Sequence, residues 1–243
     1  MAEQLIEPTS IKPWRGPRGL RALRHRNFRL YWFGQVISLT GSWMQMVAQG
    51  WLVLKLTGSA WDLGVVGAMA TVPVLVFGLP AGAMADRFDK RKIVIVTQTL
   101  AMTQALVLAG LDHSHVIRVW HVMALAAFAG TVNAFDNPIR QSMICELVDD
   151  DKDDLMNAIA LGSAAFNGAR IVGPALAGIL VVAFGTANCF LLNGLSYIAA
   201  LAALLLISSR SACAGDDGQS MYKQIKQGLS YSAGHGLIRD LLI

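Results

Sequence analysis

Arg170 needs a chemical explanation because it lies near the middle of an apolar run, Leu155 to Gly185, that is long enough to cross a bilayer. An arginine at mid-membrane costs roughly 2.5–3.5 kcal/mol on insertion scales, so a chain keeps it only where it faces protein or water. Asn167 and Pro174 lie at helical spacing from it, on the same side of a helix. That side is a candidate wall of a polar pathway through a membrane. Arg170 would favour an anionic or catechol-like group there, or be neutralised by Asp136 or a backbone carbonyl.

A polar stripe follows one face of the apolar run Tyr31–Leu56. Its members recur at steps of three and four and are Gln35, Ser38, Ser42, Gln45 and Gln49. At 1.5 Å per residue the stripe is about 21 Å long, and lipid would not tolerate that face. Two interpretations stay open: the helix lines a cavity, or the stripe holds packed helices together by hydrogen bonds, a common use of Ser and Gln in membranes.

The remaining reactive side chains predict neither a metal centre nor catalysis. The three cysteines lie far apart and lack the CxxC spacing of zinc or redox sites; they are Cys145, Cys189 and Cys213. Three histidines gather near one loop with Asp112 as their acidic neighbour, and surface histidines explain them more simply than a metal; they are His113, His115 and His121. The sequence contains no HExxH, GxSxG or phosphate-binding GxxxxGK[ST] motif. We therefore expect no enzymatic activity, no cofactor and no metal.

The elements that position these residues are apolar helices. Hydrophobic residues make up 54% of the 243 residues and charged residues only 15%, with the charges clustered between long apolar stretches. Runs of about 20 apolar residues predict six membrane spans, which are Tyr31–Leu56, Leu63–Ala85, Ile93–Leu111, Val119–Phe135, Leu155–Gly185 and Thr186–Ser208. Barrel strands would alternate in segments of about ten residues, so the fold class is all-α membrane.

The positions of lysine and arginine predict the orientation. Basic residues precede the first span, separate the second from the third and follow the sixth, whereas only Lys55 and Arg118 fall on the opposite side. We therefore expect a multi-pass protein of the cell (inner) membrane with both termini cytoplasmic. The chain divides into a basic tail (1–26), a six-helix bundle (27–208) and a linker (209–243) with an amphipathic helix and the start of a seventh span. The basic residues flank spans, which favours contact with anionic lipid over nucleic acid.

The loop after the second span carries a dense charge motif. It contains Gly82, Asp86, Arg87, Lys90 and Arg91 as Gly-x-x-x-Asp-Arg-x-x-Lys-Arg, and it resembles the signature of the major facilitator superfamily. Asp89 stands where that signature usually has glycine. Three further segments, 43–54, 136–141 and 167–178, resemble the branch of that superfamily that contains the bacterial enterobactin exporter and related efflux permeases. The likeness covers residues 20 to 243.

The resemblance implies a secondary transporter for a small molecule of siderophore or drug type, linked to protons and working by alternating access of two six-helix halves. The segment with Gly173 and Pro174 is similar to the superfamily's antiporter motif, with Ala169 and Ala177 in place of two glycines. The first and fourth spans would line the cavity. Asp86 and Lys90 would form a cytoplasmic charge relay with Asp136.

Spacing alone supports one part of this gating hypothesis, because Asp136 and Arg140 lie four residues apart on one helix and can pair. A complete member of the superfamily has twelve spans, whereas six and the opening of a seventh are expected here. We expect a fragment, a truncated product, or a half that pairs with a missing C-terminal half or a second copy. The alternative is a non-transporting membrane interaction protein or an inactive remnant.

Overall fold

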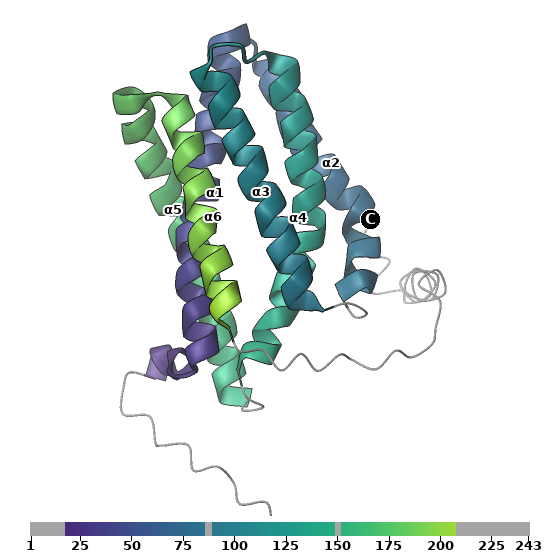
Figure 1. The fold of residues 1–243 in the computed structure, drawn as a ribbon, viewed down its shortest axis with the longest axis vertical. Helices are drawn as coiled ribbons and strands as arrows, with labels where there is room; N and C mark the ends of the chain where they lie inside the picture. Colours follow the sequence, from purple (N-terminus) through teal and green to yellow (C-terminus); the bar gives the residue numbers. More distant parts are fainter. Residues whose placement is uncertain (1–17, 86–88, 149–151, 208–243) are drawn as a thin grey trace, which may run out of the picture.

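The computed structural model describes residues 18–85, 89–148 and 152–207 and is built from helices (Figure 1). A short 3-10 segment, η1 (Arg18–Arg24), precedes six long helices. These are α1 (Arg26–Thr57), α2 (Ala60–Ala85), α3 (Lys90–His113), α4 (Val119–Leu147), α5 (Lys152–Phe184) and α6 (Thr186–Leu206). Each predicted apolar run therefore forms one helix. The fourth differs most from its prediction, because α4 runs on past Phe135 to Leu147 and so includes Asp136 and Arg140.

Tight connections reverse the chain from α1 to α2 and from α5 to α6. Gly58 ends α1 with a φ of 63°, and its backbone N–H donates to the carbonyl of Leu54. Gly185 alone joins α5 to α6, with a φ of 81°. Both positions need the left-handed region that glycine adopts without strain. As a result α1, α3 and α5 begin at the end of the bundle where α2, α4 and α6 finish (Figure 1).

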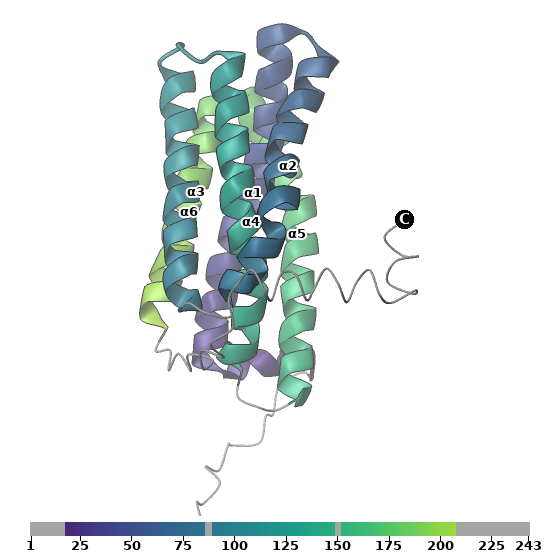
Figure 2. The ribbon, with the colours of Figure 1, turned by 90° about the vertical axis from the view of Figure 1, so that its right-hand side faces the viewer.

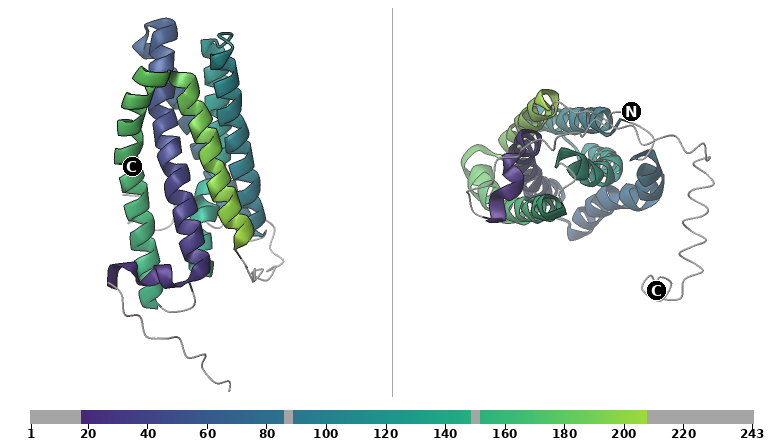
Figure 3. Two further views of the ribbon diagram at one scale, coloured as in Figure 1. Left: turned by 60° about the vertical axis from the view of Figure 1, so that its left-hand side comes forward. Right: turned by 90° about the horizontal axis from the view of Figure 1, so that it is seen from below.

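The six helices form three layers of two. Figure 2 shows α1 and α4 in the middle, with α3 and α6 on one side and α2 and α5 on the other, and Figure 3 shows the same arrangement from below. The packing contacts agree, since α1 packs mainly on α5 and α6, α4 packs mainly on α2 and α3, and α3 packs on α6. This pattern is unchanged when α1, α2 and α3 exchange places with α4, α5 and α6. The bundle is therefore a pair of similar three-helix groups.

Two apolar clusters fill the bundle, and a layer of polar side chains separates them along the helix axes. The first cluster includes Phe28, Val94, Ile139 and Leu204. The second includes Leu52, Leu108, Val122 and Phe190. Between these positions, α1, α3, α4 and α6 each bury polar side chains, which are Gln35, Ser38, Gln45, Thr97, Gln98, Gln104, Asp136 and Asn193. A buried polar group is costly unless hydrogen-bonded, so this layer is where the fold needs specific partners.

Four helices in the described part of the chain are long and apolar enough to cross a membrane, namely α2, α3, α5 and α6. The other two long helices, α1 and α4, fall outside that group because of their polar residues: α1 carries the glutamine and serine stripe, and α4 carries Asn133, Asp136, Asn137 and Arg140. Six membrane crossings thus stay a prediction. The two helices outside this group, α1 and α4, occupy equivalent positions in the two three-helix groups.

Candidate functional site

A buried charge pair lies in the polar layer. Asp136 of α4 is only 1% exposed and forms an ion pair with Arg140 one turn further along the helix. Its Oδ1 accepts hydrogen bonds from Thr97 Oγ1 at 2.6 Å and from Gln98 Nε2 at 3.1 Å. Arg140 also donates to Gln35 Oε1 of α1. The pairing expected from the spacing is confirmed, and it ties the two middle helices to α3.

The predicted relay between Lys90 and Asp136 is not formed in this structure. The Lys90 ammonium lies 2.6 Å from Glu146 Oε1 instead. Thr97, the residue of α3 that contacts Asp136, lies seven residues after Lys90, or about 10 Å along the helix. Lys90 therefore meets α4 further along, near the C-terminal end of α4. Arg91 donates to the carbonyls of Leu204 at 2.8 Å and Leu205 at 3.0 Å, at the end of α6. Both basic residues therefore bind helix ends.

Two other residues of the predicted relay motif, Asp86 and Arg87, lie outside the described residues. Gly82, in the last turns of α2, is half-buried, and a Cβ added there would meet nothing within 4 Å. Among the described residues of the motif, Lys90 and Arg91 thus contact other helices, whereas Gly82 lies at no close approach between helices.

The stripe on α1 makes hydrogen bonds to three other helices. Gln35 binds Arg140 of α4, and the Ser42 hydroxyl lies 3.1 Å from the Tyr197 hydroxyl of α6. Gln45 donates to Gln104 Oε1 of α3 at 3.0 Å and accepts from Asn193 of α6 at 2.7 Å. These contacts match the interpretation of the stripe as hydrogen bonding between helices. Ser38 is buried, whereas Gln49 is half-buried.

The predicted polar side of α5 faces away from the bundle interior. Asn167 and Arg170 are exposed and Pro174 is half-buried. The opposite side packs on α1 through small residues, among them Ala165, Ala169, Gly173 and Ala177. A Cβ added at Gly173 would lie 2.8 Å from the Thr40 carbonyl oxygen and 3.0 Å from the Met44 nitrogen, both in the backbone of α1. Arg170 and Asp136 do not pair, because the Asp136 carboxylate is taken by Arg140.

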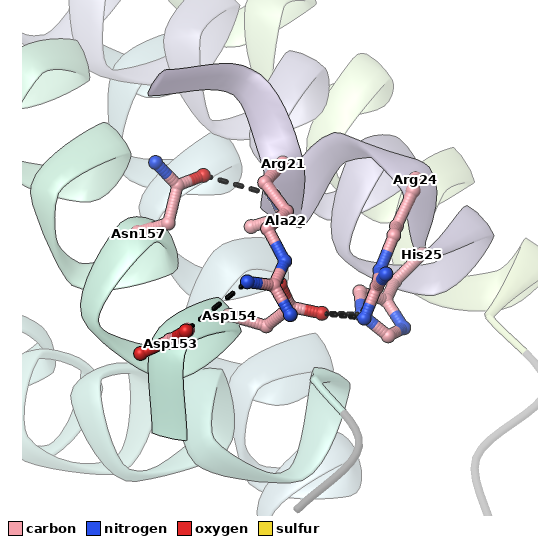
Figure 4. Close-up of polar contacts among 7 residues, drawn as sticks. All are labelled: Arg21, Ala22, Arg24, His25, Asp153, Asp154 and Asn157. Carbon is pink, nitrogen blue, oxygen red and sulfur yellow. Dashed lines mark hydrogen bonds and ion pairs between the residues drawn. The ribbon is translucent and has the colours of Figure 1, made fainter. Parts of the chain in front are cut away.

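Sequence reasoning missed a clamp between the N-terminal segment and α5 (Figure 4). Asp154 has a fully buried side chain that forms ion pairs with Arg21 Nε at 2.6 Å and Arg24 Nη2 at 2.5 Å, and its Oδ2 lies 2.7 Å from His25 Nε2. The neighbouring Asp153 pairs with Arg21 at 3.2 Å, and Asn157 Oδ1 accepts from the backbone N–H of Ala22 at 2.8 Å.

The signals for the clamp were visible in the sequence. Arginines recur every third residue before the first span, and an acidic run precedes the fifth. Residues 18–25, which belong to the predicted basic tail (1–26), form η1 and its junction with α1 and pack on α5. Opposite charges on separate segments point to a contact only when their helices are known to be neighbours, and sequence alone did not supply that.

In the described part of the chain, no group of three or more histidine, cysteine or acidic side chains is arranged to hold a metal ion. His121 has a structural contact, since its Nδ1 accepts from the backbone N–H of Arg118 at 3.0 Å and caps α4. The described residues offer buried ion pairs, amide networks and the exposed Arg170.

These features define a multi-pass helical membrane protein with a polar layer in its bundle. Residues 18–243 match the family model described as transmembrane secretion effector. The chain belongs to this family, which is part of the major facilitator superfamily of transporters.

Curated relatives support this assignment. The chain is 27% identical over 204 residues to the staphyloferrin A transporter of Staphylococcus aureus, covering 84% of this chain and 51% of the relative. It is 27% identical over 218 residues to the multidrug efflux pump Tap of Mycolicibacterium fortuitum, covering 87% and 53%. It is 28% identical over 153 residues to macrolide efflux protein A of Streptococcus pyogenes, covering 63% and 37%. The chain thus spans about half the length of the first two relatives, the staphyloferrin A transporter and Tap.

Proposed function

We propose that this chain forms the N-terminal six-helix half of a secondary transporter that exports a small molecule of siderophore or drug type by alternating access, linked to protons. The observation that carries the proposal is the family match over residues 18–243. The names of the relatives, the staphyloferrin A transporter and two kinds of efflux pump, support the proposed substrate classes. Because the chain spans about half of the first two relatives, the other half comes from further chain or from a second copy.

The layer arrangement supports a pathway along α1 and α4. These helices form the middle layer, and α1 buries Gln35, Ser38 and Gln45 while α4 buries Asp136. On the open side, α2 and α5 are the least covered of the four apolar spans, with 6% and 22% of their apolar windows buried against 39% for α3 and for α6. An uncovered side that also carries Arg170 suits contact with a second half around a polar cavity.

For the gate we propose the charges where α3 meets α4, together with the α1–α5 contact. Asp136 holds α4 to Thr97 and Gln98, Arg140 pairs with Asp136 and binds Gln35 of α1, and Lys90 holds the end of α4 through Glu146. Movement of the helices within this half would require these contacts to rearrange, with Gly173 and Pro174 letting α5 slide and bend against α1. Asp86 and Arg87 remain part of the proposed gate.

The orientation proposal follows from the distribution of basic residues. The end of the bundle where α1, α3 and α5 begin carries Arg21, Arg24, Lys90, Arg91 and Lys92, whereas the other end carries Lys55 and Arg118. Basic residues near span ends favour the cytoplasmic side. We therefore propose an inner-membrane location with this basic end, and both termini, in the cytoplasm, next to anionic lipid.

Efflux from cells tests the proposal. The gene, with whatever coding sequence follows it at its native locus, is expressed in bacteria that lack their own major pumps, and accumulation of tetracycline, erythromycin and ethidium is measured. We expect lower accumulation of at least one probe, reversed by a protonophore, and we expect Asp136→Asn to abolish the effect.

The matched control is Asp153→Asn, which makes the same change at a carboxylate that is 81% exposed and should leave efflux intact. Unchanged accumulation of all three probes by a protein that reaches the membrane would contradict the proposed export and favour a non-transporting role.

A further inference from the structure

Arg170 is an exposed cation at the middle depth of the bundle. At 1.5 Å per residue it lies about 27 Å from the start of α5 and about 21 Å from its end. Among the described residues no carboxylate forms an ion pair with it, and the acidic side chains that do form ion pairs bind other cations. A guanidinium facing hydrocarbon at this depth is strongly disfavoured. Its side of α5 must therefore meet water, protein or a ligand.

The guanidinium is positioned by an aromatic pair. Its Cζ lies 5.5 Å from the centroid of the Trp43 ring, within the range of a cation–π contact. The Phe166 ring meets Trp43 edge to face, with centroids 5.6 Å apart and an interplanar angle of 74°. Trp43 is itself held where α1 and α5 approach most closely, because a Cβ added at Gly173 would lie 2.6 Å from the Trp43 Cβ. Two helices thus fix the three side chains together.

This combination selects a ligand chemistry. A guanidinium offers five N–H donors in a planar fork that fits a carboxylate, whereas the aromatic rings offer apolar surface for a flat group beside it. Asn167 lies near Arg170 on the exposed side of α5. Its Nδ2 donates a hydrogen bond to the Ser163 carbonyl at 2.9 Å, and its Oδ1 can act as an acceptor. A cationic group would meet repulsion and no counter-charge here.

We propose that Arg170, Trp43 and Phe166 form a subsite for the planar anionic group of the transported molecule, such as an aromatic carboxylate. That this molecule is transported rests on the proposed function, whereas the binding chemistry rests on these three side chains. Arg170 is the binding residue and Trp43 positions it.

Equilibrium binding tests the subsite with three probes of similar size: salicylate as anion, benzyl alcohol as neutral ring and benzylamine as cation. The purified chain in lipid nanodiscs should bind radiolabelled salicylate more tightly than the other two. Arg170→Gln should weaken salicylate about tenfold to a hundredfold, as loss of a charge-assisted hydrogen bond does, and leave benzyl alcohol unchanged. Arg170→Lys should fall between, and Trp43→Leu should weaken salicylate about three- to tenfold.

The control is Arg29→Gln, which removes the same charge from an exposed position near the start of α1 and should not change binding. Circular dichroism shows whether each variant stays folded. The proposal would be overturned if the wild-type chain did not prefer salicylate, or if Arg170→Gln bound salicylate equally well. It would also be overturned if Arg170 affected binding only after assembly with a second half. Salicylate selectivity without efflux of any probe would contradict the proposed function and leave the subsite standing. Efflux without selectivity at Arg170 would do the reverse.

Discussion

Single residues set how closely the helices of this bundle approach. Gly173 is one such case, because α5 crosses the backbone of α1 where only a hydrogen atom fits. Glycine and alanine at such contacts let membrane helices pack by van der Waals contact and backbone proximity, where no hydrophobic effect between helices operates. The adjacent Pro174 removes one backbone donor from the same turn. Close packing and a weakened helix therefore coincide at one position.

We expect Gly173→Ala to destabilise the bundle by about 1–3 kcal/mol, the usual cost of overpacking a well-filled contact. The new Cβ would press on the backbone of Thr40 and Met44, which cannot rotate away. Gly178→Ala is the matched control on the same helix, since a Cβ there meets nothing within 4 Å. It should leave stability unchanged or raise it by up to about 1 kcal/mol. Thermal unfolding in detergent compares the two, and equal melting temperatures would rule out the close approach.

At the scale of elements, the α5 helix is held at both its N-terminal end and its middle. Its small-residue side packs on α1, and its N-terminal turn receives the arginines of η1. Asp154 is fully buried although it is a carboxylate, which is tolerable because three cationic or hydrogen-bonding side chains converge on it. The N-terminal segment therefore moves with α5 or restrains it.

Breaking this clamp should loosen the N-terminal end of α5. Asp154→Asn leaves Arg21 and Arg24 without the buried charge. We expect a loss of about 2 kcal/mol, less than for a fully buried ion pair, because both arginines keep some contact with water. Asp153→Asn makes the identical change one residue earlier, at a side chain that is 81% exposed, and should cost about 0.5 kcal/mol or less. Detergent melting curves and hydrogen exchange at residues 153–158 measure both. Equal effects would show that the buried carboxylate has no special role.

How much of the fold and of the candidate site could be predicted depends on how far apart in the sequence the contacting residues lie. Apolar run length predicted the helices, and the four-residue spacing predicted the Asp136–Arg140 pair, because both are local properties of one helix. The partners across helices could not be predicted, as in Gln35 with Arg140 or Lys90 with Glu146. Those contacts depend on which helices are neighbours and on their rotation. The end of α4 was misplaced for a related reason, since hydropathy falls at charges that the bundle itself neutralises.

At the scale of the whole molecule, the bundle has one side that differs from the rest. The α3–α6 layer closes the back, α1 and α4 carry the polar layer, and α2 and α5 leave much of their surface uncovered. A bundle surrounded by lipid alone would show only apolar side chains there. Instead α5 exposes Ser163, Asn167 and Arg170 in one row beside apolar residues. The molecule is therefore asymmetric in a way that suits an aqueous cavity shared with a second half.

Thiol accessibility tests which side faces water. In a background with Cys145, Cys189 and Cys213 replaced by serine or alanine, single cysteines are placed at Asn167→Cys on α5 and at Leu195→Cys on α6, both exposed in the bundle and near mid-helix. The reactive species is the thiolate, which forms in water and not in hydrocarbon. A membrane-impermeant methanethiosulfonate should therefore modify Asn167→Cys at least about tenfold faster than Leu195→Cys in intact membranes. Equally slow reaction at both would mean that the α5 face lies in lipid or is sealed. The pathway along this side would then be wrong, and the cost of burying Arg170 would have to be met by a direct ion pair with another chain.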